Sequence, residues 1–258
     1  MTAVRDERRC DQLLVIVLGD REAMGQAAAD HVAGRMRELL AAQPRVRAVF
    51  AAAASQTEFL AALVRAPGID WSRVEAFHLD EYVGLPRGDA RSFGRWLDDH
   101  IFSLVRPGRV ELMNGAASDP AAESARYGDL LRDGGLDLAL IGIGENGHLA
   151  FNDPHVADFD DPLVVKPVEI DATSRRQQVR DGAFPTFDDV PALALTVTMS
   201  AILASRAISV VVPGPQKAAA VAATLLGPIE TACPASALRR HPDARLFVDE
   251  AAISGVTR

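Results

Sequence analysis

The chain has 258 residues, 48% hydrophobic and 24% charged, a composition typical of a folded globular protein rather than a disordered one. Its formal net charge of -8 and isoelectric point of about 5.3 disfavour nucleic acid as a partner, so an anionic ligand would need cations or helix ends placed locally. The two cysteines, Cys10 and Cys233, are too few for a disulfide framework and lack the spacing of a metal site, which favours a reducing compartment.

The N-terminal pattern bears on the location of the protein. The first apolar run, residues 13–19, is too short to span a membrane and follows a segment dense in charges of both signs. No small-residue cleavage site follows it cleanly, so we expect no signal peptide, no membrane partner and a cytoplasmic protein. The sequence leaves open whether the protein forms a homo-oligomer.

Short apolar runs alternate with longer amphipathic runs along the chain. In chain order, the pattern predicts a strand over residues 13–18, a helix over 21–42, a strand over 46–52, a helix over 55–65, a strand over 74–79, a helix over 92–105, a strand over 109–113, a helix over 121–132, a strand over 136–141, extended segments over 163–170 and 192–198, a short helix to about 205, a strand over 207–212, helices over 215–226 and 235–240, and a strand over 244–248. This alternation predicts an α/β fold, a Rossmann-like three-layer sandwich with a mainly parallel sheet and helices on both faces. No repeat, low-complexity tract or linker divides the chain, so residues 1–258 are interpreted as a single domain.

The most informative stretch is the glycine turn that follows the apolar strand at 136–141. Residues 142–154 read Gly-Ile-Gly-Glu-Asn-Gly-His-Leu-Ala-Phe-Asn-Asp-Pro. Open α/β sheets place ligands at such strand ends, and histidine is the side chain best suited to proton transfer near neutral pH. The three glycines also match a dinucleotide-binding fingerprint, but that motif needs a helix to begin inside it, and Pro154 breaks the chain too soon. We therefore favour a catalytic turn over a nicotinamide site.

Asp80 and His148 are the candidate acid–base residues. Asp153 follows His148 closely and could orient the imidazole, as could Asn146, although a histidine in such a turn could simply bond a backbone carbonyl. Asp80 and Glu81 follow a predicted strand, and neighbouring side chains of extended backbone point to opposite faces. We expect one carboxylate to enter the crevice and the other to brace the loop, the alternative being that Asp80 only caps a turn.

Two helix starts could hold a phosphate. Ser55 and Glu58 have the spacing of a capping box, and the hydroxyls of Ser55 and Thr57 could bind an anion beside the free N–H groups. Lys217 lies in the first turn of a helix that follows Gly214, where a cation opposes the helix dipole. Because that placement is unfavourable without an anion, we favour Lys217 as an anion ligand over a solvated lysine.

Together, these segments resemble the glucosamine-6-phosphate deaminase/isomerase family, which is related to the 6-phosphogluconolactonases. The blocks that carry the resemblance lie at residues 77–85, 142–154, 214–218 and 234–249. The resemblance is ordered along the chain and covers most of it from about Val46. The lactonases share a similar histidine block but typically continue differently at residues 151–153.

The resemblance implies a role for each matched residue. Asp80 would be the enolisation base, His148 the acid–base group of ring opening, and Asp153 its supporting carboxylate. Lys217 would bind phosphate, and Ser55 matches a hydroxyl of the first phosphate loop. The full candidate set is, for catalysis, Asp80, His148, Asp153 and Asn146 and, for substrate or phosphate binding, Ser55, Gln56, Thr57, Lys217, Arg176, Arg180, Gly144 and Gly147.

The chain departs from the family pattern at several of these positions. Residues 52–56 read Ala-Ala-Ala-Ser-Gln in place of a Thr-Gly-Gly-Thr-Pro loop, which removes the glycines that permit close backbone approach. The supporting carboxylate is Asp153, one methylene shorter than the usual glutamate. Asn146 occupies a position, two residues before His148, that is often acidic in the family. Arg176 and Arg180 are both candidates for the second phosphate cation.

The reaction implied by the resemblance converts a hexosamine 6-phosphate into a ketose 6-phosphate and ammonia, without a metal or organic cofactor. Ring opening by His148 would precede proton transfer from C2 to C1 by Asp80. Two alternatives stay open: a 6-phosphogluconolactonase-like hydrolase in which His148 activates water, and a non-catalytic sugar-phosphate sensor.

Overall fold

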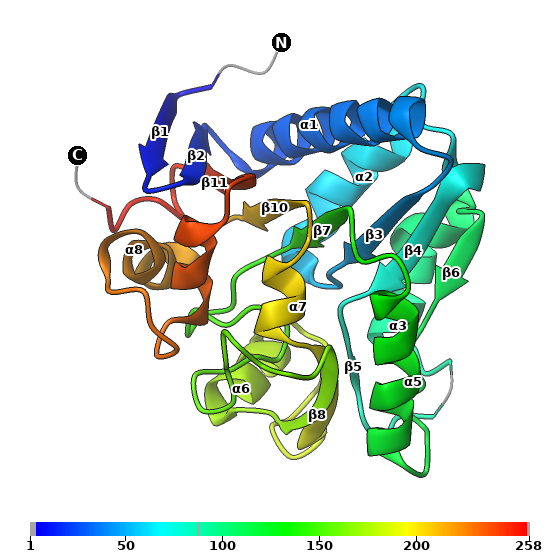
Figure 1. Cartoon of the computed structure of the whole chain (residues 1–258). Coiled ribbons are helices and arrows are strands. Elements are labelled where there is room, and N and C mark those ends of the chain that lie inside the picture. Colours follow the sequence, from blue (N-terminus) through cyan, green and yellow to red (C-terminus); the bar gives the residue numbers. More distant parts are fainter. Residues whose placement is uncertain (1–3, 87, 257–258) are drawn as a thin grey trace.

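An eight-stranded sheet runs through the centre of the protein, of which the computed structural model describes residues 4–86 and 88–256. The strands in spatial order are β1 (Asp6–Cys10), β2 (Leu13–Leu18), β11 (Ala244–Asp249), β10 (Ala207–Val212), β7 (Leu138–Ile141), β3 (Val46–Phe50), β4 (Val74–His78) and β6 (Arg109–Glu111). Neighbouring strands are parallel except for β1 and β2, which form an antiparallel pair at one edge. The parallel arrangement agrees with the prediction from sequence (Figure 1).

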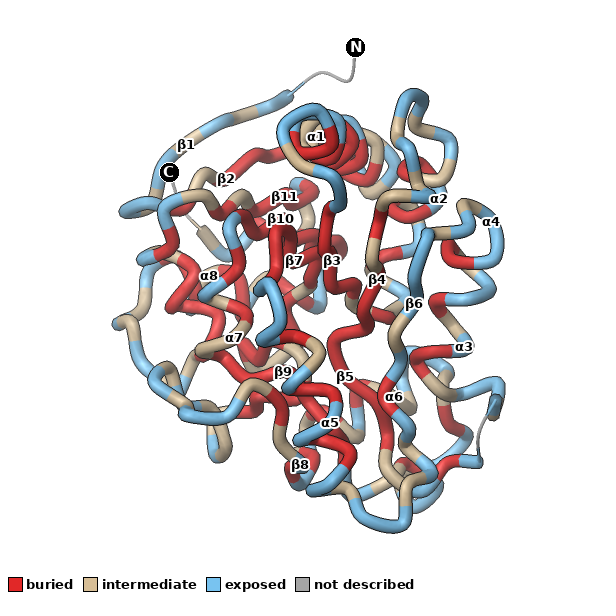
Figure 2. The backbone as a smooth tube through the Cα atoms, turned by 45° about the vertical axis from the view of Figure 1, so that its right-hand side comes forward, coloured by how far each residue is buried: buried red, intermediate tan, exposed pale blue. Residues whose placement is uncertain are grey.

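Helices cover both faces of this sheet because the side chains of each strand alternate between two apolar clusters. Ala48 and Phe50 of β3 face one cluster, while Val49 between them faces the other. The first cluster includes residues of α1 (Arg21–Ala42) and α2 (Thr57–Arg65), and the second includes residues of α5 (Pro120–Arg132), α7 (Met199–Leu203) and α8 (Ala218–Leu226). Figure 2 shows the central strands buried along their length, whereas β1 and β6 at the sheet edges are largely exposed.

A second, smaller sheet lies beside the first. Its order is β5 (Asp80–Tyr82), β9 (Leu193–Val197) and β8 (Val165–Glu169), and both pairs are antiparallel. The extended segments predicted at 163–170 and 192–198 therefore exist, but they belong to this separate sheet. In the pairing of β5 with β9, Asp80 lies opposite Thr196.

The remaining differences from the sequence prediction concern short or polar elements. Strands β1 and β5 and helix α6 (Ala172–Arg180) were not predicted. The predicted helix at 92–105 consists of α3 (Phe93–Leu97), a π-helical turn η3 (Asp98–Phe102) and α4 (Ser103–Val105). The described residues also form short 3-10 helices: η1 (Ala54–Gln56), η2 (Trp71–Arg73), η4 (Pro215–Lys217) and η5 (Pro234–Arg240).

Across residues 4–86 and 88–256, none of the helices combines the length and the apolar content that crossing a bilayer requires.

Candidate active site

A cleft lies where four neighbouring parallel strands end. Strands β10, β7, β3 and β4 are adjacent in the sheet, and the segments after their carboxyl ends contribute Lys217, His148, Ser55 and Asp80 to the lining of the cleft. Open α/β sheets bind ligands at this edge because the loops that follow the strands converge there. The fold thus brings the main sequence-predicted residues together from four separate parts of the chain.

The imidazole of His148 packs against the backbone of Gly144. A Cβ atom at Gly144 would lie 2.1 Å from Nε2 of His148, so only glycine leaves room for the ring. The amide of Gly144 also donates to the carbonyl of His148 at 2.9 Å, which closes the turn. Gly147 has a different role: its φ is +83°, and a Cβ there would lie 2.8 Å from Sγ of Cys233, outside the residues that line the cleft.

Three polar side chains surround Nδ1 of His148. This atom lies 2.7 Å from Oδ1 of Asn146, 3.0 Å from Oδ1 of Asp153 and 2.9 Å from Oγ of Ser174. Because the amide nitrogen of Asn146 donates to Asp153 at 2.9 Å, the amide oxygen faces the imidazole and accepts from it. Nδ1 therefore carries the ring proton, and Nε2, which lies beside Gly144, keeps a free lone pair in the neutral ring.

Asp153 reaches the imidazole although it is one methylene shorter than a glutamate. The side chain is fully buried and accepts from Ser174 Oγ at 2.5 Å and from the amide of Asp171 at 2.9 Å. Burial favours the neutral acid, but the hydrogen bonds and charge supplied by His148 and the bonds from Asn146 and Ser174 outweigh it, so the pKa of Asp153 falls to about 2. A carboxylate with this pKa stays ionised near neutral pH and holds the imidazole in one tautomer.

Ser174 is the one residue around the imidazole that the sequence pattern did not indicate. It lies in α6 and is fully buried, bonded to both Asp153 and His148. Helix α6 is strongly polar, so no apolar periodicity points to it. The available signal was Asp171, which caps the helix by accepting from the amide of Thr173 at 2.6 Å.

Asp80 and Glu81 point to opposite sides of β5, as alternation along a strand requires. Asp80 lines the cleft and is only 8% exposed. Burial, reinforced by the neighbouring charge of Glu81, raises the pKa of Asp80 well above its ordinary value. A carboxyl with a raised pKa accepts a proton more readily once it is ionised, which suits a general base.

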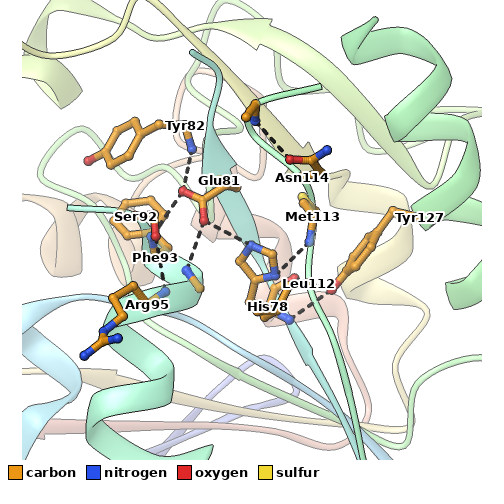
Figure 3. A network of polar contacts seen from close by, with 12 residues as sticks. His78, Glu81, Tyr82, Ser92, Phe93, Arg95, Leu112, Met113, Asn114 and Tyr127 are labelled. Carbon is orange, nitrogen blue, oxygen red and sulfur yellow. Dashed lines mark hydrogen bonds and ion pairs between the residues drawn. The ribbon is translucent and has the colours of Figure 1, made fainter. Parts of the chain in front are cut away.

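Glu81 braces the loop on the other side of the strand (Figure 3). Its Oε1 accepts from the amides of Tyr82 at 2.9 Å and Phe93 at 3.1 Å, and its Oε2 accepts from the amide of Gly94 at 3.0 Å. Two of these three donors belong to the first turn of α3, where a negative charge is stabilised by the helix dipole. The expected division between one carboxylate in the crevice and one that holds the loop is therefore present in the structure.

His78 lies behind Glu81 and is fully buried. Its Nδ1 accepts from the amide of Met113 at 3.3 Å, so the ring proton of the neutral form is on Nε2, 3.6 Å from Oε2 of Glu81 (Figure 3). The hydroxyl of Tyr127 donates to the carbonyl of His78 at 2.9 Å. His78 is therefore a structural residue at the end of β4.

Lys217 also lines the cleft, and other charged side chains act on it. Lys217 is 5% exposed, and burial lowers its pKa, while the charges of Asp181 and Glu145 act in the other direction. Arg180 forms an ion pair with Glu145, and its side chain is about half exposed. Neither Arg180 nor the exposed Arg176 is among the residues that line the cleft.

The loop after β3 differs from the sequence expectation. The predicted capping box is wrong: Glu58 pairs with Nε of Arg21 at 2.9 Å, and no side chain caps α2. Thr57 is exposed and does not line the cleft, whereas Ser55 and Gln56 do. Alanine at residues 52–54 needs no left-handed backbone, and Ala53 is extended with φ of -165°.

Within the described part of the chain, no three His, Cys, Asp or Glu side chains gather in the way that a metal ion would require.

The comparisons with known proteins agree with this geometry. The model of the family described as glucosamine-6-phosphate isomerases/6-phosphogluconolactonase matches residues 19–247. The chain is 37% identical over 198 residues to a glucosamine-6-phosphate deaminase of Halothermothrix orenii, which covers 76% of this chain and 80% of the relative. It is 39% identical over 194 residues to a glucosamine-6-phosphate deaminase of Bacillus velezensis, covering 74% and 78%.

Two solved structures are similar to this chain, one in sequence and fold and the other in fold alone. A monomeric glucosamine-6-phosphate deaminase superimposes with a TM-score of 0.86 at 32% identity, over 93% of this chain and 99% of the other. A 6-phosphogluconolactonase from Thermotoga maritima superimposes with a TM-score of 0.75 at 19% identity, over 92% and 100%, and that likeness concerns the fold alone.

Proposed function

Because the chain belongs to the family of glucosamine-6-phosphate isomerases and 6-phosphogluconolactonases, we propose that it is an amino-sugar phosphate deaminase. The substrate would be glucosamine 6-phosphate or a related hexosamine 6-phosphate, and the products a ketose 6-phosphate and ammonia. The observation that carries this proposal is the pairing, in one cleft, of a buried carboxyl of raised pKa with an imidazole held in a single tautomer. The relatives named as deaminases support the same activity.

The tautomer of His148 suits the first step. Its free Nε2 can accept the proton of the C1 hydroxyl and deliver a proton to the ring oxygen, which opens the ring to the aldehyde. The positive charge that forms on the imidazole is stabilised by the ionised Asp153 at 3.0 Å. Asn146 and Ser174 keep both groups in place.

Asp80 would perform the second step. Its carboxylate removes the C2 proton, and the C–H electron pair moves into the C1 carbonyl, whose oxygen takes a proton from the C2 ammonium group to give an enolamine. Asp80 then returns the proton it took to C1, which leaves a protonated imine at C2. Water then adds to the imine and ammonia departs, so one water is consumed for each ammonia released. An acid–base group of this kind contributes roughly 10²–10⁴-fold to the rate.

Lys217 and Ser55, which both line the cleft, would hold the phosphate. A buried ammonium has lost its hydration and gains strongly from an anionic partner. Of the two candidate arginines, Arg180 is the better candidate, because its charge acts on Lys217. The two cysteines are unpaired, which fits the cytoplasmic location that we also propose.

A substrate panel tests the proposal. Purified protein is assayed for ammonia release from glucosamine 6-phosphate and galactosamine 6-phosphate, and for acid release from 6-phosphogluconolactone. We expect ammonia release with a kcat/KM in the ordinary enzyme range of about 10⁴–10⁸ M⁻¹s⁻¹ for the better hexosamine phosphate. Hydrolysis of the lactone without ammonia release would favour the lactonase alternative over the proposal. In that alternative no C2 proton is removed, so Asp80 is not needed as a base. Binding without turnover of any of the three would indicate a sensor.

A further inference from the structure

Gln56 ties the loop after β3 to the end of β10. Its side chain is 1% exposed, and its amide nitrogen donates to the carbonyl of Val211 at 3.2 Å and to the hydroxyl of Ser55 at 3.2 Å. The orientation of the amide is determined by Val211, because a flipped amide would place its oxygen against the carbonyl oxygen. Gly142 permits this packing, since a Cβ there would lie 2.9 Å from the amide nitrogen.

The direction of these hydrogen bonds determines what Ser55 can do. A serine hydroxyl has one proton to donate, and accepting from Gln56 does not use it. Among residues 4–86 and 88–256, no acceptor takes the proton of Ser55. Ser55 lines the same cleft as Lys217, so the cleft offers a hydroxyl donor as well as a buried ammonium. Two donors of this kind favour an anion between them.

The amide oxygen of Gln56 argues against a role in packing alone. It is buried and has no hydrogen-bond partner within the described residues. A buried polar atom without a partner costs about 1–3 kcal/mol, whereas an apolar side chain of similar size at this position would avoid that cost. The oxygen also cannot serve a phosphate, since both are acceptors. A glutamine at this position therefore acts through its nitrogen.

We propose that Gln56 is a positioning residue that turns the hydroxyl of Ser55 toward the phosphate of the substrate. This inference rests on the proposed function, and it replaces direct phosphate contact by Gln56. In this chain the alanines at 52–54 lack the backbone approach that a glycine pair offers, and an oriented side-chain hydroxyl supplies a donor in its place. The ligand chemistry is a phosphomonoester.

The test is a double-mutant cycle of Gln56→Leu and Ser55→Ala. For each variant, KM and kcat are measured with the best hexosamine phosphate, and the affinity for inorganic phosphate is measured by calorimetry without turnover. We expect Ser55→Ala to raise KM roughly 10-fold or more, because a hydrogen bond to a charged group is lost. Gln56→Leu should raise KM by a smaller factor, and kcat should change by less than about twofold in either variant.

The double variant carries the decisive prediction. Once the hydroxyl is absent there is nothing left to orient, so Gln56→Leu should add no further loss in KM or phosphate affinity to Ser55→Ala. Additive losses would mean that Gln56 acts independently of Ser55, and a loss of kcat at constant KM would mean that it only supports the fold. Either result overturns the proposal.

Two controls separate this result from other failures. Gln26→Leu makes the same change where the amide bonds Asp30 at 2.8 Å on α1, and it should leave KM and phosphate affinity unchanged. If Gln56→Leu does not fold, Ser55→Ala alone still decides, because unchanged phosphate affinity in that variant contradicts the inference. If no sugar phosphate is turned over but phosphate binding follows the expected cycle, the proposed function fails while this inference stands.

Discussion

At the scale of single residues, the two carboxyls of the site have opposite pKa shifts although both are buried. Asp153 is surrounded by donors, so its pKa falls to about 2 despite complete burial. Burial raises the pKa of Asp80 instead, and the charge of the neighbouring Glu81 adds to this shift. The same amino acid is thereby made a permanent anion in one position and a proton acceptor in the other.

Replacing Asp80 by asparagine should lower kcat roughly 10²–10⁴-fold or more and leave substrate affinity within about threefold. Asparagine keeps the shape of the side chain but cannot accept the C2 proton.

The same variant should be more stable than the wild type near neutral pH. A carboxyl whose pKa is raised in the folded state destabilises that state at pH values above its unfolded pKa, and this cost disappears at lower pH, where both states are protonated.

The measurement is urea unfolding of both proteins near neutral pH and again below the unfolded pKa of aspartate, combined with steady-state kinetics. Asp129→Asn, at a side chain that is 75% exposed, is the matched control and should change neither quantity. Wild-type turnover in Asp80→Asn would remove Asp80 as the base. A stability gain that persists unchanged at low pH would show that ionisation is not its cause.

Replacing Lys217 by alanine should raise KM roughly 10- to 150-fold with little change in kcat. A desolvated charge-assisted contact contributes about 1.5–3 kcal/mol, and a phosphate that does not react is held equally in the ground and transition states. Steady-state kinetics with the phosphorylated substrate checks this expectation. Lys166, the other lysine of the chain, bonds Asp161 at 2.7 Å and provides the control substitution. An unchanged KM in Lys217→Ala would place the phosphate elsewhere.

At the scale of elements, β5 sends Asp80 into the cleft and Glu81 onto the first turn of α3. The groups nearest Glu81 are backbone amides and the ring of His78, whose proton on Nε2 points to it at 3.6 Å. No arginine or lysine side chain pairs with Glu81 among the described residues. Its negative charge is therefore poorly neutralised by side chains and acts on Asp80 next to it.

Glu81→Gln should move the acidic limb of the pH profile of kcat/KM to lower pH, because removing the charge of Glu81 lowers the pKa of Asp80. The plateau rate should fall as well, since a less basic carboxylate removes the C2 proton more slowly. Glu22→Gln, on the exposed side of α1, should leave the profile in place. If the limb stays where it is in Glu81→Gln while the rate falls, Glu81 acts only by holding α3.

The elements that sequence could predict are those whose stability is local or whose residues are mostly apolar. Strand β7 is wholly apolar, β3 and β10 each contain one polar residue (Arg47 and Ser209), and the turns after these strands mark the cleft. Strand β5 has only three residues, and it exists because β9, far along the chain, pairs with it. Helix α6 buries only the polar Ser174 and Gln177, so hydrophobic periodicity gives no sign of it.

The sequence likewise indicates the candidate site residues that follow strand ends, but not those that only the tertiary structure brings to the site. Asp80, His148 and Lys217 follow strand ends and meet because parallel strands end at one edge. Ser174 reaches His148 through the placement of α6, which no local pattern encodes. The choice between the two arginines also depends on which face of α6 meets the cleft, a property of the tertiary structure alone.

At the scale of the whole molecule, the cleft is lined both by β5 of the small sheet and by loops that follow strands of the large sheet, and Thr196 of β9 connects the two. The residue pairs with Asp80 across the small sheet, and its hydroxyl accepts from the amide of Phe151 at 3.1 Å in the turn that carries His148. Thr196 is fully buried. One residue therefore connects the strand of the candidate base, through backbone pairing, to the turn of the candidate acid, through its hydroxyl.

Thr196→Val should lower kcat by about tenfold and leave KM within about twofold. Valine keeps the volume of the side chain but leaves the amide of Phe151 without its acceptor, which costs roughly 1–3 kcal/mol. Thr224→Val is a closely matched control. Thr224 is equally buried, but its hydroxyl bonds the carbonyl of Ala220 within α8. Equal effects of the two substitutions on kcat would show that the link between the sheets has no part in catalysis.

The link through Thr196 also determines when the protein loses the conformational entropy of bringing Asp80 and His148 together. Strand pairing and a buried hydrogen bond hold the carboxylate and the imidazole at one separation, so this ordering takes place once, as the chain folds, and is not repeated in each catalytic cycle. The sugar then needs to lose only its own freedom to reach a reactive arrangement. Folding therefore orders the catalytic groups in advance of substrate binding. Mutations that weaken strand pairing in the small sheet should lower kcat while the protein is still folded.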